Sequence, residues 1–120
     1  MDQAPYNLDE VRRGVVLAAI QEECTHRGWS LLAAHVRSNH VHAVVGAEVA
    51  PERIMGDFKV YASRRLNRMK VDEPGRKRWA RHGSTRRLWK PQNVSAAIRY
   101  VVDDQGEPMA VFEALGIEGV

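Results

Sequence analysis

The feature that most restricts the fold is a change in the spacing of apolar residues along the first 69 residues, from a helical spacing to strand-like alternation and back. Residues 9–26 and residues 51–69 carry apolar side chains at the three- and four-residue spacing of a helix. Between them, residues 29–37 and residues 40–46 alternate as β-strands do. The order helix, strand, strand, helix is most of a βαββαβ unit, so we predict an α+β fold, a ferredoxin-like antiparallel sheet with helices packed on it.

The ends of the two helices carry suitable residue types. Asn7 and Glu10 have the spacing of a capping box, which predicts Asn7 as the N-cap of the first helix. Gly28 suits the C-terminal cap of that helix. Pro51 suits the first turn of the second helix, and Glu52 is favourable near its positive end.

Side chains of the two strands divide between two faces because successive residues point to opposite sides. In the first strand, one face carries Leu32, Ala34 and Val36, and the other carries Leu31, Ala33 and His35. In the second strand, Val41, Ala43 and Val45 share one face. We expect a hairpin, turning at Ser38 and Asn39, whose apolar faces pack against the first helix.

Beyond residue 69 the pattern is weaker. Residues 71–90 are predicted to be a basic loop region within one domain that spans residues 1–120. Residues 93–101 predict a third helix, or a helix leading into a strand, and the tail from Gly106 is acidic and weakly patterned. Residues 1–6, which precede the predicted N-cap of the first helix, do not supply a full strand. The first strand of the unit is therefore either missing or supplied by a partner chain.

Charge is unevenly distributed along the chain. Residues 1–52 contain four Lys/Arg and seven Asp/Glu, residues 53–90 contain thirteen and three, and residues 91–120 contain one and five. The net charges of the three segments are therefore −3, +10 and −4. A solvated helix and loop would explain a single charge run, but a basic middle with Trp79 and Trp89 interleaved favours a nucleic-acid partner.

The sequence gives no sign of a membrane or secreted setting. The longest apolar run, residues 15–20, is far too short to cross a bilayer, and the N-terminus has no signal-like segment. Cys24 has no cysteine partner and lies in an apolar helical pattern, which indicates a small buried side chain. We expect a cytoplasmic protein with no membrane contact.

Two histidines are candidate metal ligands. His40 and His42 are two residues apart in a predicted strand, so both point to one face while Val41 points to the other. Two adjacent imidazoles can bind a divalent metal, which can polarise a scissile phosphate. Two surface histidines on an exposed sheet face would give the same pattern, and the spacing alone favours that simpler interpretation.

Tyr61 is a candidate nucleophile. It lies at the edge of the apolar stripe of residues 51–69, where its ring can pack while its hydroxyl stays exposed. A tyrosine that only flanks the core is the simpler interpretation. Four cations lie near Tyr61 on the same predicted helix and suit either phosphate binding or a solvated face: Lys59, Arg64, Arg65 and Arg68.

Several segments together resemble a known family. Residues 37–45, Arg-Ser-Asn-His-Val-His-Ala-Val-Val, resemble the Asn-His-Val-His strand of the HUH single-tyrosine transposases, which include the REP-associated tyrosine transposases. Residues 59–67 resemble their catalytic helix. Residues 81–85, with Leu88-Trp89 and then residues 98–102, resemble the segment that follows in REP-associated relatives. The resemblance extends in order from about residue 8 to residue 113.

The resemblance implies an activity and a site. It implies a ferredoxin-like fold, often in a homodimer, with Mg²⁺ or Mn²⁺ bound by His40 and His42. It implies that Tyr61 attacks a phosphate of single-stranded or hairpin DNA. The products would be a 5′-phosphotyrosine link and a free 3′-hydroxyl, and a second transfer would rejoin the DNA without ATP.

The third metal ligand departs from the family pattern. Some members carry a Gln, His or Asn one turn after the tyrosine, where this chain has Arg65, which cannot bind a divalent cation. Asn67 is about 120° away around the helix. His82 from the loop is the first choice as third ligand, and Asp57 the second. The expected DNA-binding residues are Lys59, Arg64, Arg65, Arg68, Arg81, Arg86 and Trp89.

Three functions are compatible with these observations. The first, an HUH transposase-like nuclease, unites the histidine pair, the tyrosine, the basic middle and the tryptophans. The second is a non-catalytic module of the same fold that binds single-stranded nucleic acid and needs only the basic surface and aromatic side chains. The third is a structural or regulatory protein that dimerises through exposed sheet edges.

Overall fold

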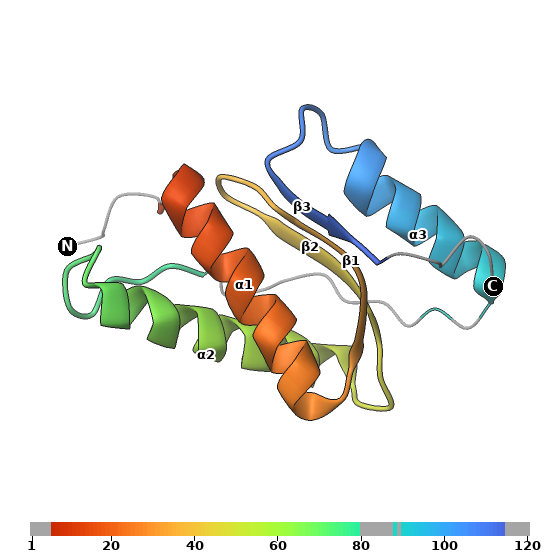
Figure 1. The fold of residues 1–120 in the computed structure, drawn as a ribbon, viewed down its shortest axis with the longest axis horizontal. Helices are drawn as coiled ribbons and strands as arrows, with labels where there is room; N and C mark the ends of the chain where they lie inside the picture. The colour runs from red at the N-terminus through yellow and green to blue at the C-terminus, as the bar shows by residue number, and fades with distance from the viewer. Residues whose placement is uncertain (1–5, 80–87, 89, 115–120) are drawn as a thin grey trace.

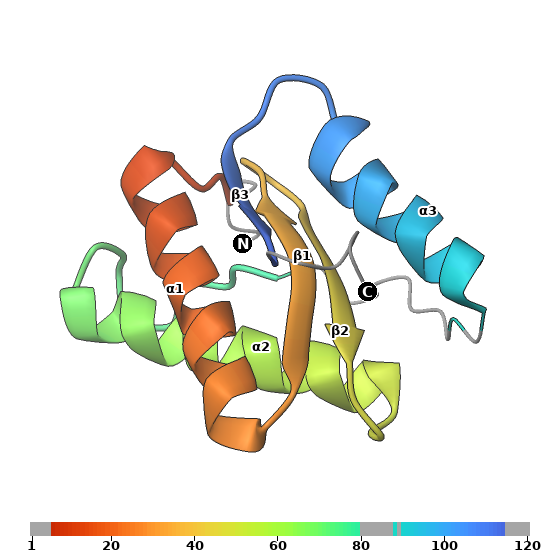
Figure 2. The ribbon, with the colours of Figure 1, turned by 45° about the vertical axis from the view of Figure 1, so that its right-hand side comes forward.

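The computed structural model describes residues 6–79, 88 and 90–114. The elements within these residues are α1 (Glu10–Arg27), β1 (Ser30–Val36), β2 (Val41–Gly46), α2 (Pro51–Met69), α3 (Pro91–Asp103) and β3 (Ala110–Glu113). An antiparallel sheet separates α1 and α2 on one side from α3 on the other (Figures 1 and 2). The chain is therefore α+β, as the apolar period predicted. None of the described helices is both long and apolar enough to cross a bilayer.

The ends of α1 differ in part from the sequence prediction. The N-cap is Asp9 rather than Asn7, because the Asp9 carboxylate accepts the backbone N–H of Arg12 at 2.9 Å. Gly28 is the C-cap, as predicted, with a φ of 74° that favours glycine. There the Trp29 N–H donates to the Cys24 carbonyl at 2.9 Å, so the helix end turns directly into β1.

The sheet has the order β2-β1-β3, so β1 is the central strand. The predicted hairpin is present, and the Arg37 N–H closes its turn by donating to the His40 carbonyl at 2.8 Å. β3 pairs with the other edge of β1; a helix leading into a strand was one of the two alternatives for residues 93–101, but the sequence pattern did not locate a strand at residues 110–113. In the part of the chain that the structure describes, no strand precedes α1.

A bulge in β1 overturns part of the predicted face pattern. Leu31 pairs with Val45 and Ala33 with the adjacent Val44, so Leu32 is the extra residue between two ladder pairs. Leu31 therefore packs beside the α1–α2 core and Leu32 beside α3, the reverse of the expected faces. Of the three β2 residues expected against α1, Val45 packs there, whereas Val41 is 37% exposed.

Two apolar clusters lie on opposite faces of the sheet. The larger joins α1, α2 and β1 through residues that include Val16, Ile20, Val36, Phe58 and Leu66. The smaller joins α3 to the sheet through Ala33, Val44, Ile98 and Val101. Cys24 belongs to the larger cluster, as expected, and burial followed by the charge of Glu23 raises the pKa of its thiol to about 11.

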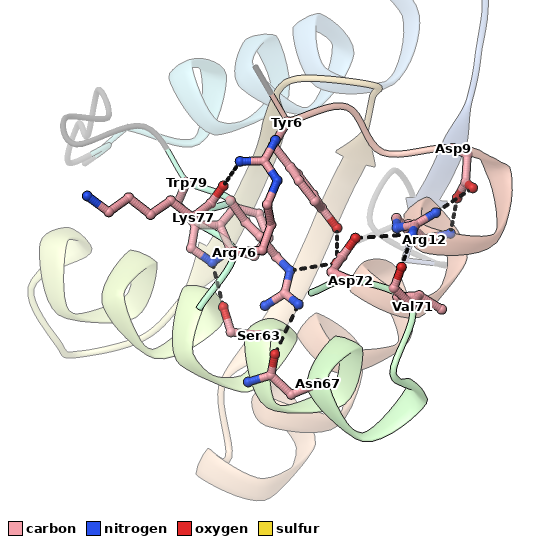
Figure 3. Close-up of polar contacts among 11 residues, drawn as sticks. Tyr6, Asp9, Arg12, Ser63, Asn67, Val71, Asp72, Arg76, Lys77 and Trp79 are labelled. Carbon is pink, nitrogen blue, oxygen red and sulfur yellow. Dashed lines mark hydrogen bonds and ion pairs between the residues drawn. The ribbon is translucent and has the colours of Figure 1, made fainter. Parts of the chain in front are cut away.

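A buried ion-pair cluster attaches the segment after α2 to the start of α1 (Figure 3). The Asp72 carboxylate accepts hydrogen bonds from the Tyr6 hydroxyl at 2.7 Å, Arg78 at 3.0 Å and Arg12 at 3.1 Å. The side chains of Asp72 and Arg78 are only 9% and 4% exposed. Since the charges of Asp72 and Arg78 are desolvated, each needs the other as a partner, and these contacts attach the segment to the start of α1.

Trp79 continues this attachment rather than projecting into solvent. Its indole N–H donates to the Ser63 hydroxyl at 2.7 Å, and its ring packs beside the larger apolar cluster. Arg78 also donates to the Asn67 side chain at 3.0 Å. The first half of the basic loop region is therefore packed along α2 and α1.

We predict that Asp72→Asn lowers the free energy of unfolding at pH 7 by about 3 kcal/mol, because it leaves the buried Arg78 without its counter-charge. Burial by itself raises the pKa of Asp72, but hydrogen bonds from Tyr6, Arg78 and Arg12 outweigh it and hold the pKa below the usual 3.8. A lowered pKa means that the ionised form stabilises the fold above about pH 4, and that this stability is lost as the pH falls through the folded-state pKa.

Urea unfolding of wild type and Asp72→Asn at several pH values tests this prediction. The stability difference should be full at pH 6–8 and shrink below about pH 4. Asp103→Asn, at an exposed position, is the matched control. A difference that is constant over the whole pH range would contradict the role of the charge.

Candidate active site

The turn between β1 and β2 brings two imidazole rings together at the start of β2. The rings of His40 and His42 are stacked, with centroids 6.1 Å apart and planes inclined by 10°. Nδ1 of His40 lies 2.6 Å from the Asn39 side-chain oxygen, so Nδ1 carries the proton and donates. Nε2 of His40 is therefore the nitrogen whose lone pair can bind a metal.

The surroundings of His42 favour its unprotonated form. His42 is half-buried and lies opposite His35 in the β1–β2 ladder. Burial, followed by the nearby His40, His35 and Arg37, lowers the pKa of His42 below the ordinary value of 6.5. Because only the unprotonated ring can donate a lone pair, His42 is available as a ligand at neutral pH.

The residue that the fold brings against this pair is Tyr100 of α3. Ile98 and Val101 of α3 are buried against the sheet. Tyr100 lies beside them at the rim, with 53% of its surface exposed. Its ring meets the ring of His42 edge to face, with centroids 6.1 Å apart and planes inclined by 89°. A tyrosine hydroxyl and two imidazoles therefore share one accessible surface.

Tyr61, the nucleophile predicted from the sequence, lies elsewhere in this chain. It is half-buried on α2 and lines a hollow of about 170 Å³ together with Glu22 of α1 and three arginines of α2. α1 and α2 cover the face of the sheet opposite to α3 (Figure 2). The structure therefore does not bring Tyr61 together with the histidines within one chain.

The donor set for a metal is two nitrogen atoms. Within residues 6–79, 88 and 90–114, no group of three or more His, Cys, Asp or Glu side chains is arranged to hold a metal ion. His82, the first choice as third ligand, lies outside the described residues. Asp57, the second choice, lies 3.6 Å from the guanidinium of Arg27 and faces α1. The pair at His40 and His42 suits a divalent ion whose other ligands are water and substrate oxygens.

Some of the expected DNA-binding residues lie on α2, and the others lie outside the described residues. On α2, Arg64 and Arg68 are exposed beside Tyr61, whereas Arg65 forms an ion pair with Glu22. Lys59 is half-buried on the same helix. The remaining candidates lie outside the described residues: Arg81, Arg86 and Trp89.

Part of the basic segment serves the fold. Arg78 is buried on Asp72, and the guanidinium of Arg76 stacks over the Tyr6 ring at 5.1 Å. Trp79, counted among the interleaved aromatic side chains, donates its N–H to Ser63 and packs against the core. The charge available to a polyanion is therefore smaller than the sum over residues 53–90 suggests.

Sequence reasoning gave no role to Tyr100 or His35. Tyr100 flanks the apolar stripe of its helix just as Tyr61 flanks the stripe of α2, so helical spacing cannot rank the two. The discriminating fact is which face of the sheet each helix covers. His35 was assigned to a strand face, and its burial depends on α3, whose packing partner the sequence did not identify.

Comparison with known proteins gives a family match. The sequence model of a family described as "Transposase IS200 like" matches residues 7–99. This range contains His40, His42 and Tyr61 and ends one residue before Tyr100. No curated protein and no solved structure matches the chain significantly.

We predict that the histidine pair is the principal Mn²⁺ site of the protein. Titration of the protein into Mn²⁺, followed by the electron paramagnetic resonance signal of free Mn²⁺, should show one binding event that His40→Gln or His42→Gln weakens at least about 10-fold. His26→Gln removes an exposed histidine of α1 and is the matched control. Equal binding by all four proteins would exclude the pair as the site.

Proposed function

Because this chain belongs to the IS200-like transposase family, we propose that it cuts and rejoins single-stranded DNA through a covalent phosphotyrosine intermediate. The observation that carries the proposal is the shared surface of His40, His42 and Tyr100. A metal-binding pair beside a nucleophilic side chain is the minimum that such a reaction requires.

We assign the nucleophile to Tyr100 within one chain. Its ring contacts His42 and more than half of its surface is exposed, so a phosphate can reach both its hydroxyl and the histidine pair. Tyr61 remains the alternative that the family resemblance implied. It would require a histidine pair from outside its own chain, because it lines a hollow with Glu22 of α1, whereas His42 contacts Tyr100 of α3.

The reaction forms one bond and breaks one bond at phosphorus. The Tyr100 oxygen attacks the phosphate, the new O–P bond links the tyrosine to the 5′ side, and the P–O3′ bond breaks. The phenol loses its proton, and the departing 3′ oxygen gains one to become a hydroxyl. The reverse attack by another 3′-hydroxyl rejoins DNA, and the phosphodiester energy is conserved in the phosphotyrosine.

Mg²⁺ or Mn²⁺, implied by the family resemblance, is part of this proposal, with His40 and His42 as its protein ligands. Asn39 orients the His40 ring, and burial favours the unprotonated His42 ring, which supports both as ligands. A divalent cation bound there would supply charge that polarises the scissile phosphate. Tyr100, whose ring contacts His42, places its hydroxyl at the same surface.

We also propose that α2 binds the phosphate backbone of the DNA. Arg64 and Arg68 are exposed and flank the hollow at Tyr61. Arginine forks suit phosphate groups, and contacts of this kind bind without reading sequence. Hairpin DNA as substrate and a homodimer as the active form, both implied by the family resemblance, are parts of this proposal.

We predict that wild-type protein with Mn²⁺ forms a denaturant-stable adduct with a pool of single-stranded oligonucleotides of random sequence. Tyr100→Phe should form none, because phenylalanine keeps the ring packing and removes the attacking oxygen. Tyr61→Phe, the matched control on α2, should retain the adduct. Labels at both oligonucleotide ends, read on a denaturing gel, identify the 5′ linkage.

The possible outcomes separate the alternatives. Loss of the adduct in Tyr61→Phe and its retention in Tyr100→Phe would transfer the nucleophile to Tyr61. Binding of the oligonucleotides without any adduct, insensitive to both substitutions and to metal removal, would indicate the non-catalytic binding module instead.

We predict that Arg64→Ala and Arg68→Ala each weaken binding of the same oligonucleotides and flatten its salt dependence. The slope of log K against log salt should fall by about 0.7 for each lost phosphate contact. Arg53→Ala, at an exposed position in the first turn of α2, is the control, and fluorescence anisotropy measures the affinity. An unchanged slope in both variants would place the DNA elsewhere.

A further inference from the structure

His35 is a fully buried polar side chain between the sheet and α3. It lies in the central strand β1, with 0% of its surface exposed, directly opposite His42 in the β1–β2 ladder. The described polar residues include only one other that is buried to this degree, Glu23. A histidine is costly to bury unless its nitrogens are hydrogen-bonded, so its contacts show what the position requires.

Both ring nitrogens of His35 have partners, and the partners determine the tautomer. Nδ1 lies 3.0 Å from the Val101 carbonyl oxygen, which can only accept, so Nδ1 carries the proton. Nε2 accepts the backbone N–H of Met109 at 3.0 Å and lies 3.3 Å from the guanidinium of Arg37. His35 therefore has no lone pair left for a metal, although it is adjacent to His42.

The bond to Val101 acts on the part of α3 that carries Tyr100. Val101 is in the last turn of α3, where carbonyl groups lack partners within the helix. His35 satisfies this carbonyl from the sheet, one residue beyond Tyr100. Successive residues of a helix are rotated by 100° about its axis. A rotation of α3 that broke the hydrogen bond to Val101 would therefore move Tyr100 away from His42.

The same histidine fixes the return of the chain from α3 to β3. Arg37, which approaches Nε2, also donates to the Glu107 carbonyl at 2.9 Å. The Met109 N–H on Nε2 lies one residue before β3. Both ends of the connection are thus tied to one imidazole. The apolar contacts of α3 come from buried Ile98 and Val101 and from partly buried Val94, Ala97 and Val102, and apolar contacts specify a single arrangement less strictly than directional hydrogen bonds do.

We infer that His35 is a positioning residue that holds α3 in the rotation that places Tyr100 against His42. As far as catalysis is concerned, this inference rests on the proposed function, but the placement of the Tyr100 ring does not. A histidine that served only to fill the core would stabilise the protein without controlling this one ring contact.

Two substitutions separate the two ring nitrogens. In His35→Asn, the side-chain NH₂ lies near the former Nδ1 position and can still donate to Val101. In His35→Gln, the longer side chain reaches toward the Nε2 position and the donor to Val101 is displaced. Ile20→Val shortens a fully buried side chain of the other apolar cluster and is the control for lost stability alone.

The direct measurement is the NMR spectrum of the His42 ring protons, which sense the Tyr100 ring. Tyr100→Ala defines the shift that accompanies loss of the ring contact. We expect His35→Gln to move the His42 signals toward that value, and His35→Asn and Ile20→Val to leave them near wild type. In wild type, a long-range ¹H–¹⁵N spectrum should show the His35 proton on Nδ1.

Rates of adduct formation provide the second readout, on an oligonucleotide recovered from the random pool. His35→Gln should slow the reaction about 10- to 100-fold at unchanged Kd for DNA, and His35→Asn should restore most of the rate. If wild type forms no adduct, the proposed function fails and the NMR result alone decides the role of His35.

The inference is overturned by any of three results. One is a His42 spectrum that His35→Gln leaves unchanged, and another is a wild-type His35 proton on Nε2. In the third, His35→Gln changes the His42 signals and the rate of adduct formation no more than Ile20→Val does at the same loss of melting temperature. Should His35→Gln fail to fold, the inference still fails if wild type carries the His35 proton on Nε2, or if His35→Asn, which keeps the donor to Val101, moves the His42 signals to the Tyr100→Ala value.

Discussion

The structure depends on the burial of the central strand β1 from both sides. Ala33, Ala34, His35 and Val36 are all fully buried, so each face of β1 needs its own cover. α1 with α2 provides one cover and α3 the other, and the small alanines let α3 and α1 approach the sheet closely. This arrangement also separates two candidate nucleophiles. Tyr100 of α3 contacts His42, whereas Tyr61 lies on the α1–α2 side of the sheet.

Buried polar groups then determine how segments are placed where the apolar clusters do not specify one arrangement. Asp72 gathers Tyr6, Arg12 and Arg78 and attaches the segment after α2 to the start of α1. On the opposite face, His35 ties α3 and the chain beyond it to β1. In both places a single buried group makes two hydrogen bonds to residues at least 60 positions away in the sequence. Such groups specify one arrangement among several that apolar packing would tolerate.

The elements themselves were largely predictable from the sequence, because they depend on local period and end signals. α2 was predicted with the bounds that the structure has, Pro51–Met69, and Gly28 was correctly identified as the cap of α1. A strand following the third helix was one of two alternatives, but β3 was not located at residues 110–113, because a four-residue strand is too short to show alternation. The faces of Leu31 and Leu32 were predicted wrongly, since a bulge leaves no mark in the alternation of apolar residues.

The candidate site was predicted only in part. The His40 and His42 pairing follows from strand geometry, whereas the contact of Tyr100 with His42 is long-range and depends on where α3 packs.

The position of His42 on β2 has a consequence for the shape of a ligand. β2 is an outer strand of the sheet, and its free side is not covered by another strand in the described part of the chain. A reactive group on such a rim can be approached from the side. A long polymer can then lie across it at any point along its length, without a free end that must be threaded through a tunnel. Closed circles and continuous strands are therefore as accessible to this surface as short fragments.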